Sequence, residues 1–148
     1  MFNYKLQHTH SVRLEVTRQA DLAIRALVTL GDPEHREGRT SARAFAEQLG
    51  TSAGFMSQVM NPLVKARWIS SEAGRTGGYH LEVPLQSLTV LDVVELVDGP
   101  IDNGVCIVVG APCDSHEQCP MHTSWAPARK VLMDALGKRR LDKVKLGY

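Results

Sequence analysis

The sequence predicts a mainly α-helical fold that carries one small β-hairpin. Three segments in the first half of the chain repeat apolar residues at intervals of three and four, which places these residues on one face of a helix. Two short segments that we interpret as strands follow, and a glycine-containing stretch separates them. The chain has 148 residues, of which 43% are hydrophobic, so it is long enough for one domain with a core of its own.

The first helix is expected over residues 17–30, after a polar leader of residues 1–12 that we expect to be flexible. Thr17 is a suitable N-cap, because its hydroxyl can accept a bond from an unpaired helix amide. Gly31 is a suitable C-terminal stop, because glycine readily leaves the helical conformation. The apolar face of this helix comprises Ala20, Ala23, Ile24 and Leu27.

Two further helices follow in quick succession. Ser41 can cap a helix that ends at Gly50, and Thr51 or Ser52 can cap the next one. Two amphipathic helices joined by so short a glycine-containing turn are typical of a helix-turn-helix, although an ordinary helical hairpin gives the same pattern. Pro62 lies in the later helix, where its missing N–H predicts a kink or an early end.

The outward face of the later helix carries short or amide side chains instead of the Glu/Lys pairs that are common on solvated helices. Such side chains can hydrogen-bond base edges and phosphates in a major groove, and a plain solvated face is the alternative. The residues on this face are Gly54, Ser57, Gln58, Asn61 and Lys65. The candidate DNA-binding set adds the capping serines Ser41 and Ser52, and Arg75 and Thr76 of the hairpin.

The predicted hairpin comprises Ile69–Glu72 and residues 80–83, linked by Ala-Gly-Arg-Thr-Gly-Gly. Glycines at a hairpin tip permit positive φ and allow the backbone to approach a partner closely. Arg75 at this tip can reach a minor groove or a phosphate. Three helices followed by a hairpin form the layout of a winged helix, so we predict a winged helix-turn-helix DNA-binding domain over residues 13–99.

The rest of the chain divides into a helix, an irregular segment and a terminal helix. Thr89 and Asp92 resemble a capping box at the start of a short helix. Residues 100–123 hold several prolines and glycines without periodicity, which favours a functional loop. A helix is expected over residues 124–136, with Pro127 in its first turn and a basic tail after it. Its apolar side is compatible with dimer packing and equally with packing onto its own domain; it comprises Trp125, Ala128, Leu132 and Leu136.

Three cysteines lie in the irregular segment: Cys106, Cys113 and Cys119. An odd number of cysteines in a chain without a visible secretion signal argues against a disulfide scaffold and favours metal or redox chemistry. Thiolates are preferred ligands of iron–sulfur clusters and of zinc, and the absence of a tight Cys-x2–4-Cys pair disfavours zinc without excluding it. His122 is the best candidate for a fourth ligand, followed by His116 or a carboxylate from elsewhere.

Other classes of protein find little support in the sequence. No apolar run approaches the length of a membrane span and the amino-terminal residues are too polar for a signal peptide, so we expect a cytoplasmic protein with no membrane partner. We expect no enzyme, because the chain lacks a Cys-x-x-Cys pair, a phosphate-binding glycine loop and a catalytic constellation. The net charge of +1 means that any positive surface is local. A small iron–sulfur or thiol redox protein, and a winged-helix interaction module with a structural metal, remain as alternatives.

Five segments in this order resemble the IscR/NsrR (BadM-type) family of winged-helix iron–sulfur regulators, over roughly residues 14–136. They are the opening helix TRQADLAIRAL, the pair SARAFAEQLGTSAGFMSQVMNPLVKARWI, the hairpin EAGRTGGYHL, the helix SLTVLDVVELVDGP and the cysteine loop. The resemblance implies a homodimer on a palindromic operator of double-stranded DNA, with residues 124–148 as dimerisation helix and basic tail. It also implies that a cluster in residues 100–123 modulates operator affinity in response to nitric oxide, redox state or iron–sulfur status.

The resemblance leaves the type of cluster open. The segment CPMHTSW is similar to the region in which a histidine completes a 2Fe–2S site in the iron–sulfur-assembly regulators, which implies His122 as the fourth ligand. In the nitric-oxide sensors of the family an aspartate of the partner's first helix fills that role, and Asp21 matches its position; a 4Fe–4S cluster is the alternative. Six residues separate the first two cysteines where five are common in the family, and the leader is extra.

Overall fold

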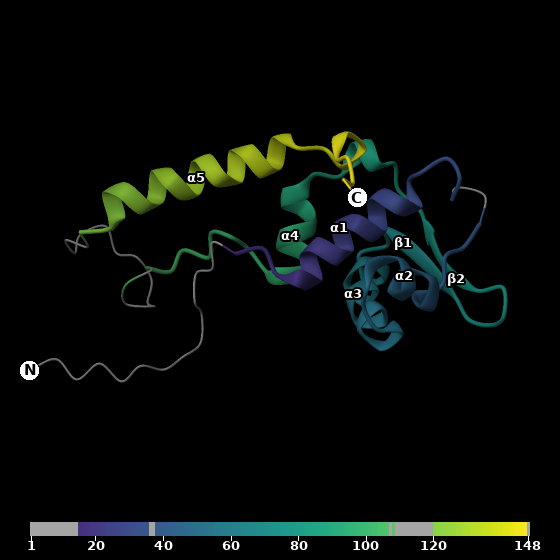
Figure 1. Cartoon of the computed structure of the whole chain (residues 1–148). Helices are drawn as coiled ribbons and strands as arrows, with labels where there is room; N and C mark the ends of the chain where they lie inside the picture. The colour runs from purple at the N-terminus through teal and green to yellow at the C-terminus, as the bar shows by residue number, and fades with distance from the viewer. Residues whose placement is uncertain (1–14, 36–37, 107, 109–119, 148) are drawn as a thin grey trace, which may run out of the picture.

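The structure is a computed structural model that describes residues 15–35, 38–106, 108 and 120–147. Four helices and a hairpin form one body, and a fifth helix reaches away from it along one side (Figure 1). This mainly α fold with a β-hairpin wing confirms the predicted fold class. The elements in chain order are α1 (Arg18–Leu30), α2 (Ala42–Leu49), α3 (Ala53–Lys65), β1 (Ile69–Glu72), β2 (Gly78–Leu81), the 3-10 helix η1 (Leu85–Ser87), α4 (Val90–Asp98), α5 (His122–Lys138) and the 3-10 helix η2 (Leu141–Lys143).

The first four helices begin at the side-chain caps that the sequence predicts. The hydroxyls of Thr17, Ser41 and Ser52 each accept a bond from the backbone N–H three residues later, at 3.1–3.2 Å. Thr89 and Asp92 form the expected capping box at the start of α4. These bonds satisfy helix amides that have no partner inside the helix, so the sequence itself sets where each helix starts.

Pro62 does not end α3 early, which was one of the two outcomes expected from its missing N–H. The helix continues to Lys65 and then closes with a Schellman motif, in which the N–H of Trp68 donates to the carbonyl of Leu63 at 3.0 Å. Arg67 occupies the left-handed position of this motif, with φ of 60°. Because Pro62 stands in the last turn, its ring removes a single helix bond close to an end that is already capped by other bonds.

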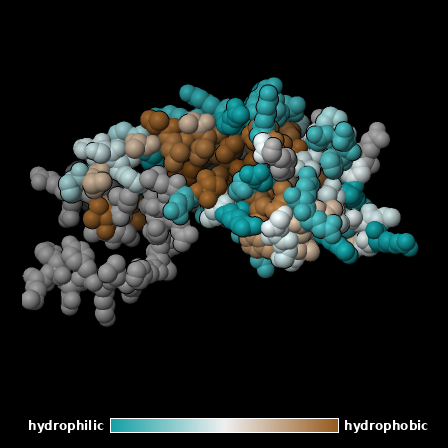
Figure 2. Space-filling model, in the orientation of Figure 1, coloured by the Kyte–Doolittle hydropathy of each residue, from teal (hydrophilic) through white to brown (hydrophobic). Residues whose placement is uncertain are grey.

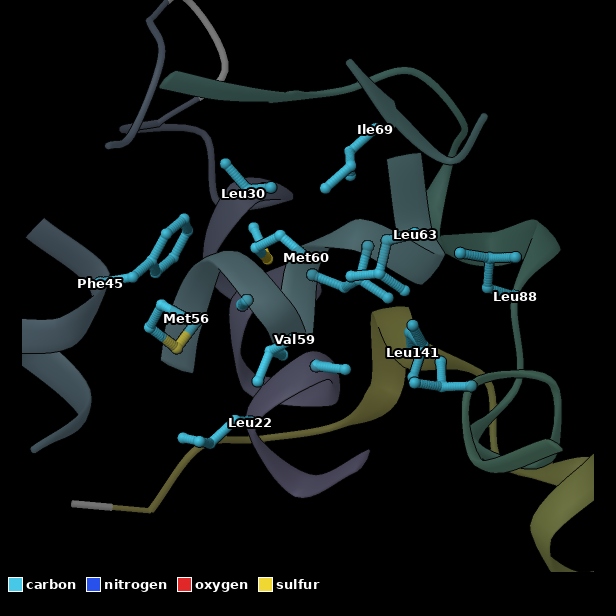
Figure 3. Packing of buried hydrophobic residues seen from close by; sticks show 14 of the residues in the cluster. Leu22, Leu30, Phe45, Met56, Val59, Met60, Leu63, Ile69, Leu88 and Leu141 are labelled. Atoms are coloured by element: carbon cyan, nitrogen blue, oxygen red, sulfur yellow. The ribbon is translucent and has the colours of Figure 1, made fainter. Parts of the chain in front are cut away.

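The hydrophobic core lies between α1 and α3 and is completed by residues of α2, β1, α4 and η2 (Figure 3). Phe45 of α2, Met60 and Leu63 of α3 and Ile69 of β1 point into this space, and each is at most 2% exposed. Leu141 of η2 is also fully buried there. The core therefore joins residues from both ends of the described chain.

The hairpin is shifted by two residues from the predicted one, because β2 covers Gly78–Leu81 and not residues 80–83. Gly78 pairs with Glu72, so it belongs to the strand and not to the turn. A Cβ atom on Gly78 would lie 2.7 Å from the backbone carbonyl of Thr40, which forms a bridge with Tyr79. This glycine is needed for the close approach of a third chain segment, a role that the sequence pattern does not distinguish from a turn.

The terminal helix is longer than expected, since α5 covers His122–Lys138 instead of residues 124–136. Pro127 is therefore a full turn inside the helix and not in its first turn. None of the residues of α5 is buried in the single chain. No helix in the described ranges is long and apolar enough to cross a membrane.

The tail after α5 folds back onto the winged-helix body. The N–H of Leu141 donates to the carbonyl of Leu88 at 2.9 Å, and the N–H of Val90 donates to the carbonyl of Arg139 at 2.8 Å. The two ends of α5 therefore differ in what they contact. The carboxyl end packs beside α4, and the amino-terminal half extends beyond the body (Figure 1). The sequence left open whether the terminal helix packs in a dimer or onto its own domain. Its carboxyl end packs onto its own domain.

Candidate nucleic-acid interface and cysteine segment

The outward face of α3 presents the polar residues that the sequence analysis singled out. Gly54, Gln58, Asn61 and Lys65 are exposed and Ser57 is half-buried. The opposite face of the helix is fully in the core, through Met56, Val59, Met60 and Leu63. Because the apolar face fixes the rotation of the helix, the amide and hydroxyl groups are held outward, where they can hydrogen-bond base edges or phosphates.

The three serines of the candidate set all take part in helix structure. Ser41 and Ser52 accept cap bonds, which leaves each hydroxyl hydrogen available as a donor to a phosphate. The hydroxyl of Ser57 donates to the carbonyl of Ala53 at 3.0 Å, so its oxygen can only accept a further bond. The cap geometry therefore leaves Ser41 and Ser52 better able than Ser57 to contact a phosphate.

The turn between α2 and α3 is fixed by Gly50 and by a cation of α1. Gly50 adopts the left-handed conformation, with φ of 65° and ψ of 45°. The guanidinium of Arg18 donates to the carbonyl of Gly50 at 3.2 Å. This bond ties the first helix to the helix-turn-helix, and the sequence analysis did not assign Arg18 a role.

The wing carries Arg75 and Thr76 at an exposed tip between β1 and β2. Arg39, which precedes α2, holds the base of the wing: its Nε pairs with Glu72 at 2.9 Å and its Nη1 donates to Ser70 and to the carbonyl of Gly78. Sequence reasoning missed this arginine, because a single cation in a polar loop gives no periodic signal. Arg39 thus bonds to both strands of the hairpin and holds them in place below the exposed tip.

The cysteine segment is described only at its two ends. Cys106 is buried, with 5% of its surface exposed, and His122 is the half-buried first residue of α5. Cys113, Cys119 and the alternative ligand His116 lie outside the described residues, as does the leader of residues 1–12. In the part of the chain that the structure describes, no three metal-ligating side chains come together.

The beginning of the cysteine segment is bonded to both neighbouring helices. Arg129 of α5 pairs with Asp102 at 2.6 Å, and the side chain of Arg129 is 10% exposed. The N–H of Ile101 donates to the carboxylate of Glu95 in α4 at 3.2 Å. A bond from the backbone N–H of Gly104, and then the bond from Arg129, lower the pKa of Asp102 below its usual value of 3.8.

His122, Trp125 and Arg129 lie on the same face of α5, because their spacing of three and four residues returns to one side of a helix. All three are half-buried, whereas Thr123 and Ala128 between them are exposed. The sequence analysis had placed Ala128 on the inner side of this helix. Arg129 occupies that side instead, because its guanidinium reaches Asp102.

Asp21, the alternative ligand on α1, is already paired. Its carboxylate accepts from Nε of Arg25, four residues later, at 2.9 Å, and half of its side-chain surface is exposed. The start of the same helix is bonded to the end of α4, since Asp98 accepts from both the backbone N–H and the hydroxyl of Thr17, at 3.1 and 2.6 Å.

Comparisons with known proteins place the chain among transcription regulators. The family model of Rrf2, described as an iron-dependent transcriptional regulator, matches residues 16–145. An rrf2-like helix-turn-helix regulator of Rhodobacter capsulatus is 30% identical over 131 residues, covering 82% of this chain and 87% of the relative. The solved structure of CymR, the global cysteine regulator of B. subtilis, has a TM-score of 0.71 at 22% identity and covers 88% of this chain and 95% of that one. That of IscR from T. potens has a TM-score of 0.66 at 21% identity, covering 94% and 98%.

These matches confirm the family resemblance drawn from the five segments. The family and the matching relatives are transcriptional regulators and not enzymes. The sequence match extends from the residue before the α1 cap to the tail that completes the core. The chain belongs to the Rrf2 family of transcriptional regulators.

Proposed function

We propose that this regulator is a homodimer that binds a palindromic operator, and that an iron–sulfur cluster on Cys106, Cys113, Cys119 and His122 modulates its affinity for DNA. In each protomer α3 enters a major groove and the tip of the wing contacts a phosphate or the minor groove. The DNA contacts are those of the candidate set: Ser41, Ser52, Gly54, Ser57, Gln58, Asn61, Lys65, Arg75 and Thr76.

The observation that carries the cluster proposal is the ion pair between Asp102 and Arg129. Asp102 is four residues before Cys106, and Arg129 is seven residues after His122, which is about two helical turns or roughly 10 Å along α5. The pair therefore fastens the stretch just before Cys106 to the helix that begins with His122. The chemistry of this set, thiolates and an imidazole, fits a 2Fe–2S cluster, which when bound supplies a redox centre whose loss changes local charge.

Two observations favour His122 over Asp21 as the fourth ligand. His122 follows Cys119 by three residues and begins the helix that holds the other end of the segment. Asp21 is engaged by Arg25, so ligation by Asp21 of the partner subunit requires that this ion pair open or be shared. A 4Fe–4S cluster with Asp21 is the second form that this chain can support.

The homodimer is supported by the surface of α5. This helix has 17 residues and none is buried in the single chain, although Leu132, Met133 and Leu136 are half-buried and Val131 is 68% exposed. Hydrophobic side chains gather over α4 and the carboxyl-terminal half of α5 (Figure 2). Exposed apolar surface of this kind favours association, and a second copy of α5 is the partner that we propose.

The proposal is tested first by anaerobic purification with iron and sulfide counts and an absorption spectrum, which separates 2Fe–2S from 4Fe–4S forms. Operator affinity is then compared for cluster-loaded and cluster-free protein at fixed salt. We expect different affinities; equal affinities would remove the sensing role and leave the DNA-binding role intact. Protein that stays colourless and cannot be loaded with iron and sulfide refutes the cluster.

Three variants and one control assign the roles of individual residues. Cys113→Ala and His122→Ala are expected to lose or alter the cluster, whereas Thr123→Ala, at the exposed neighbour of His122, is the matched control and keeps it. Arg75→Ala is expected to weaken DNA binding and to lower the salt dependence by about one counterion per lost phosphate contact, without changing the iron content. An unchanged affinity for Arg75→Ala would contradict the assignment of the wing.

A further inference from the structure

The segment before α2 lies against the wing and is bonded to its second strand. Thr40 and Tyr79 exchange two backbone hydrogen bonds, at 3.0 and 2.9 Å, in an antiparallel bridge. Beside this bridge the carbonyl of Gly38 accepts a bond from Nδ1 of His80 at 3.3 Å. Because Ser41, the cap of α2, follows Thr40 directly, the wing is bonded to the residue that leads into the helix-turn-helix.

Arg39 lies in this segment and bonds to both strands of the hairpin. Its Nε pairs with Glu72 of β1 at 2.9 Å, and its Nη1 donates to the hydroxyl of Ser70 and to the carbonyl of Gly78, at 3.2 and 3.3 Å. A guanidinium is planar and holds its N–H groups at fixed angles. These three bonds therefore fix how the two strands sit relative to the segment before α2.

The bonds of Arg39 reach the last strand pair before the wing tip. Glu72 pairs with Gly78, and residues 73–77 between them form the tip that carries the exposed Arg75. Ordering a loop and a long side chain on binding costs free energy, and this cost is smaller when the base of the loop is already held in place. The bonds at the base therefore reduce the freedom that Arg75 must lose when it contacts DNA.

The bonding pattern of Arg39 argues against two simpler roles. An arginine that binds a phosphate directly presents its guanidinium to solvent, whereas the side chain of Arg39 is 23% exposed and its N–H groups face the hairpin. An arginine that only neutralises Glu72 does not need the two bonds from Nη1 to uncharged oxygens. The geometry is that of a brace between the wing and the start of α2.

We propose that Arg39 is a positioning residue of the DNA interface, which does not contact DNA and raises operator affinity by holding Arg75 where the wing and α3 engage the duplex together. This inference rests on the proposed contact of the wing with DNA. It makes Arg39 and Arg75 one energetic unit, so removing both costs little more than removing Arg75 alone. Two independent phosphate contacts would instead add.

The test is a double-mutant cycle of Arg39→Ala and Arg75→Ala on the full chain. The probe is a DNA duplex that the wild-type protein selects from a random pool, and its Kd is measured for every variant at the same salt concentration and iron content. We expect each single variant to lose roughly fivefold in affinity at physiological salt, which is the counterion contribution of one phosphate contact. Arg39→Ala is expected to cost less than about twofold when residue 75 is already alanine.

Two further variants separate position from charge. Arg43→Ala is the matched control, because it also removes an arginine near the start of α2, but the partner of Arg43 is Glu47 of the same helix. Its effect on affinity is expected to be the same with and without Arg75. Arg39→Lys keeps the positive charge and lacks the planar fork, so we expect it not to restore affinity. If urea unfolding shows that Arg39→Ala is not folded, the cycle is run with Arg39→Lys.

The outcomes distinguish this inference from the proposed function. Equal losses for Arg39→Ala with and without Arg75 overturn the inference alone, because they mean that Arg39 acts on DNA independently of the wing tip. Wild-type affinity in Arg39→Ala, or full recovery in Arg39→Lys, also overturns it. Unchanged affinity in Arg75→Ala means that the wing does not contact DNA, and this result overturns the wing assignment of the proposed function as well.

Discussion

Replacing Leu141 with alanine tests whether the chain after α5 is part of the core. This leucine is fully buried, and the body of the domain surrounds it although it lies only a few residues from the end of the chain (Figure 3). Replacement of a buried leucine by alanine costs about 2–5 kcal/mol, from lost transfer free energy and from the cavity left behind. The backbone bond from the N–H of Leu141 to Leu88 remains possible in the variant, and a terminal segment can relax, so we expect about 3 kcal/mol. Native domains have only about 5–15 kcal/mol in total, so the effect is large.

The assay is urea unfolding of wild type and variant at one protomer concentration, because the proposed dimerisation would make apparent stability depend on concentration. The midpoint is expected to fall with the slope unchanged, which identifies a loss of stability and not a change of the unfolded state. Leu146→Ala, at the half-buried leucine further along the same tail, is the matched control, with an expected cost below about 1 kcal/mol. A cost under about 1 kcal/mol for Leu141→Ala would refute the placement of the tail in the core.

Three further variants test local features. Arg67→Gly is expected to stabilise the domain by about 0.5–1 kcal/mol in urea unfolding, because glycine adopts the left-handed position of the Schellman motif without steric cost; destabilisation would contradict that geometry. Thr89→Ala removes the capping box and is expected to cost about 1 kcal/mol, whereas no loss would mean that α4 does not depend on its cap. Because the folded state lowers the pKa of Asp102, the stability it contributes is present above pH 3.8 and is lost as the pH falls through the lower folded value. Asp102→Asn should therefore flatten this acid limb of thermal stability, and an unchanged limb would show that the bonds to Asp102 do not contribute.

The sequence predicted the elements whose signals are local. The caps Thr17, Ser41 and Ser52 and the capping box of α4 depend on side chains within three residues of the helix start, so their pattern alone locates the helices. The apolar stripe of α3 predicted which side is buried, and with it the outward set from Gly54 to Lys65.

The features that sequence reasoning missed depend on residues far apart in the chain. Gly78 belongs to a strand because Thr40 approaches it, and Leu141 is a core residue because its backbone bonds to Leu88. Arg129 is on the inner side of α5 because Asp102 lies opposite. In each case a tertiary contact decides the role, and no window of neighbouring residues contains that information.

The residues of the candidate site also fall into two groups, those with a signal in the sequence and those whose role depends on a distant contact. The sequence supplied the candidate ligand residues and the candidate wing arginine, because residue type and spacing point to that chemistry; both stay predictions. The supporting residues Arg18, Arg39 and Arg129 were not found, because an arginine that braces a turn, a hairpin or a loop looks like any solvated cation in a linear pattern.

The double hydrogen bond from Thr17 to Asp98 has a mechanical consequence. Gly99 follows Asp98 directly and leads into the cysteine segment, so one carboxylate joins the departure point of that segment to the first turn of α1. Because both bonds go to one carboxylate, moving either segment away from the other breaks the two bonds together. Arg18, the residue after Thr17, donates to the carbonyl of Gly50, so the same first turn of α1 is also bonded to the turn between α2 and α3.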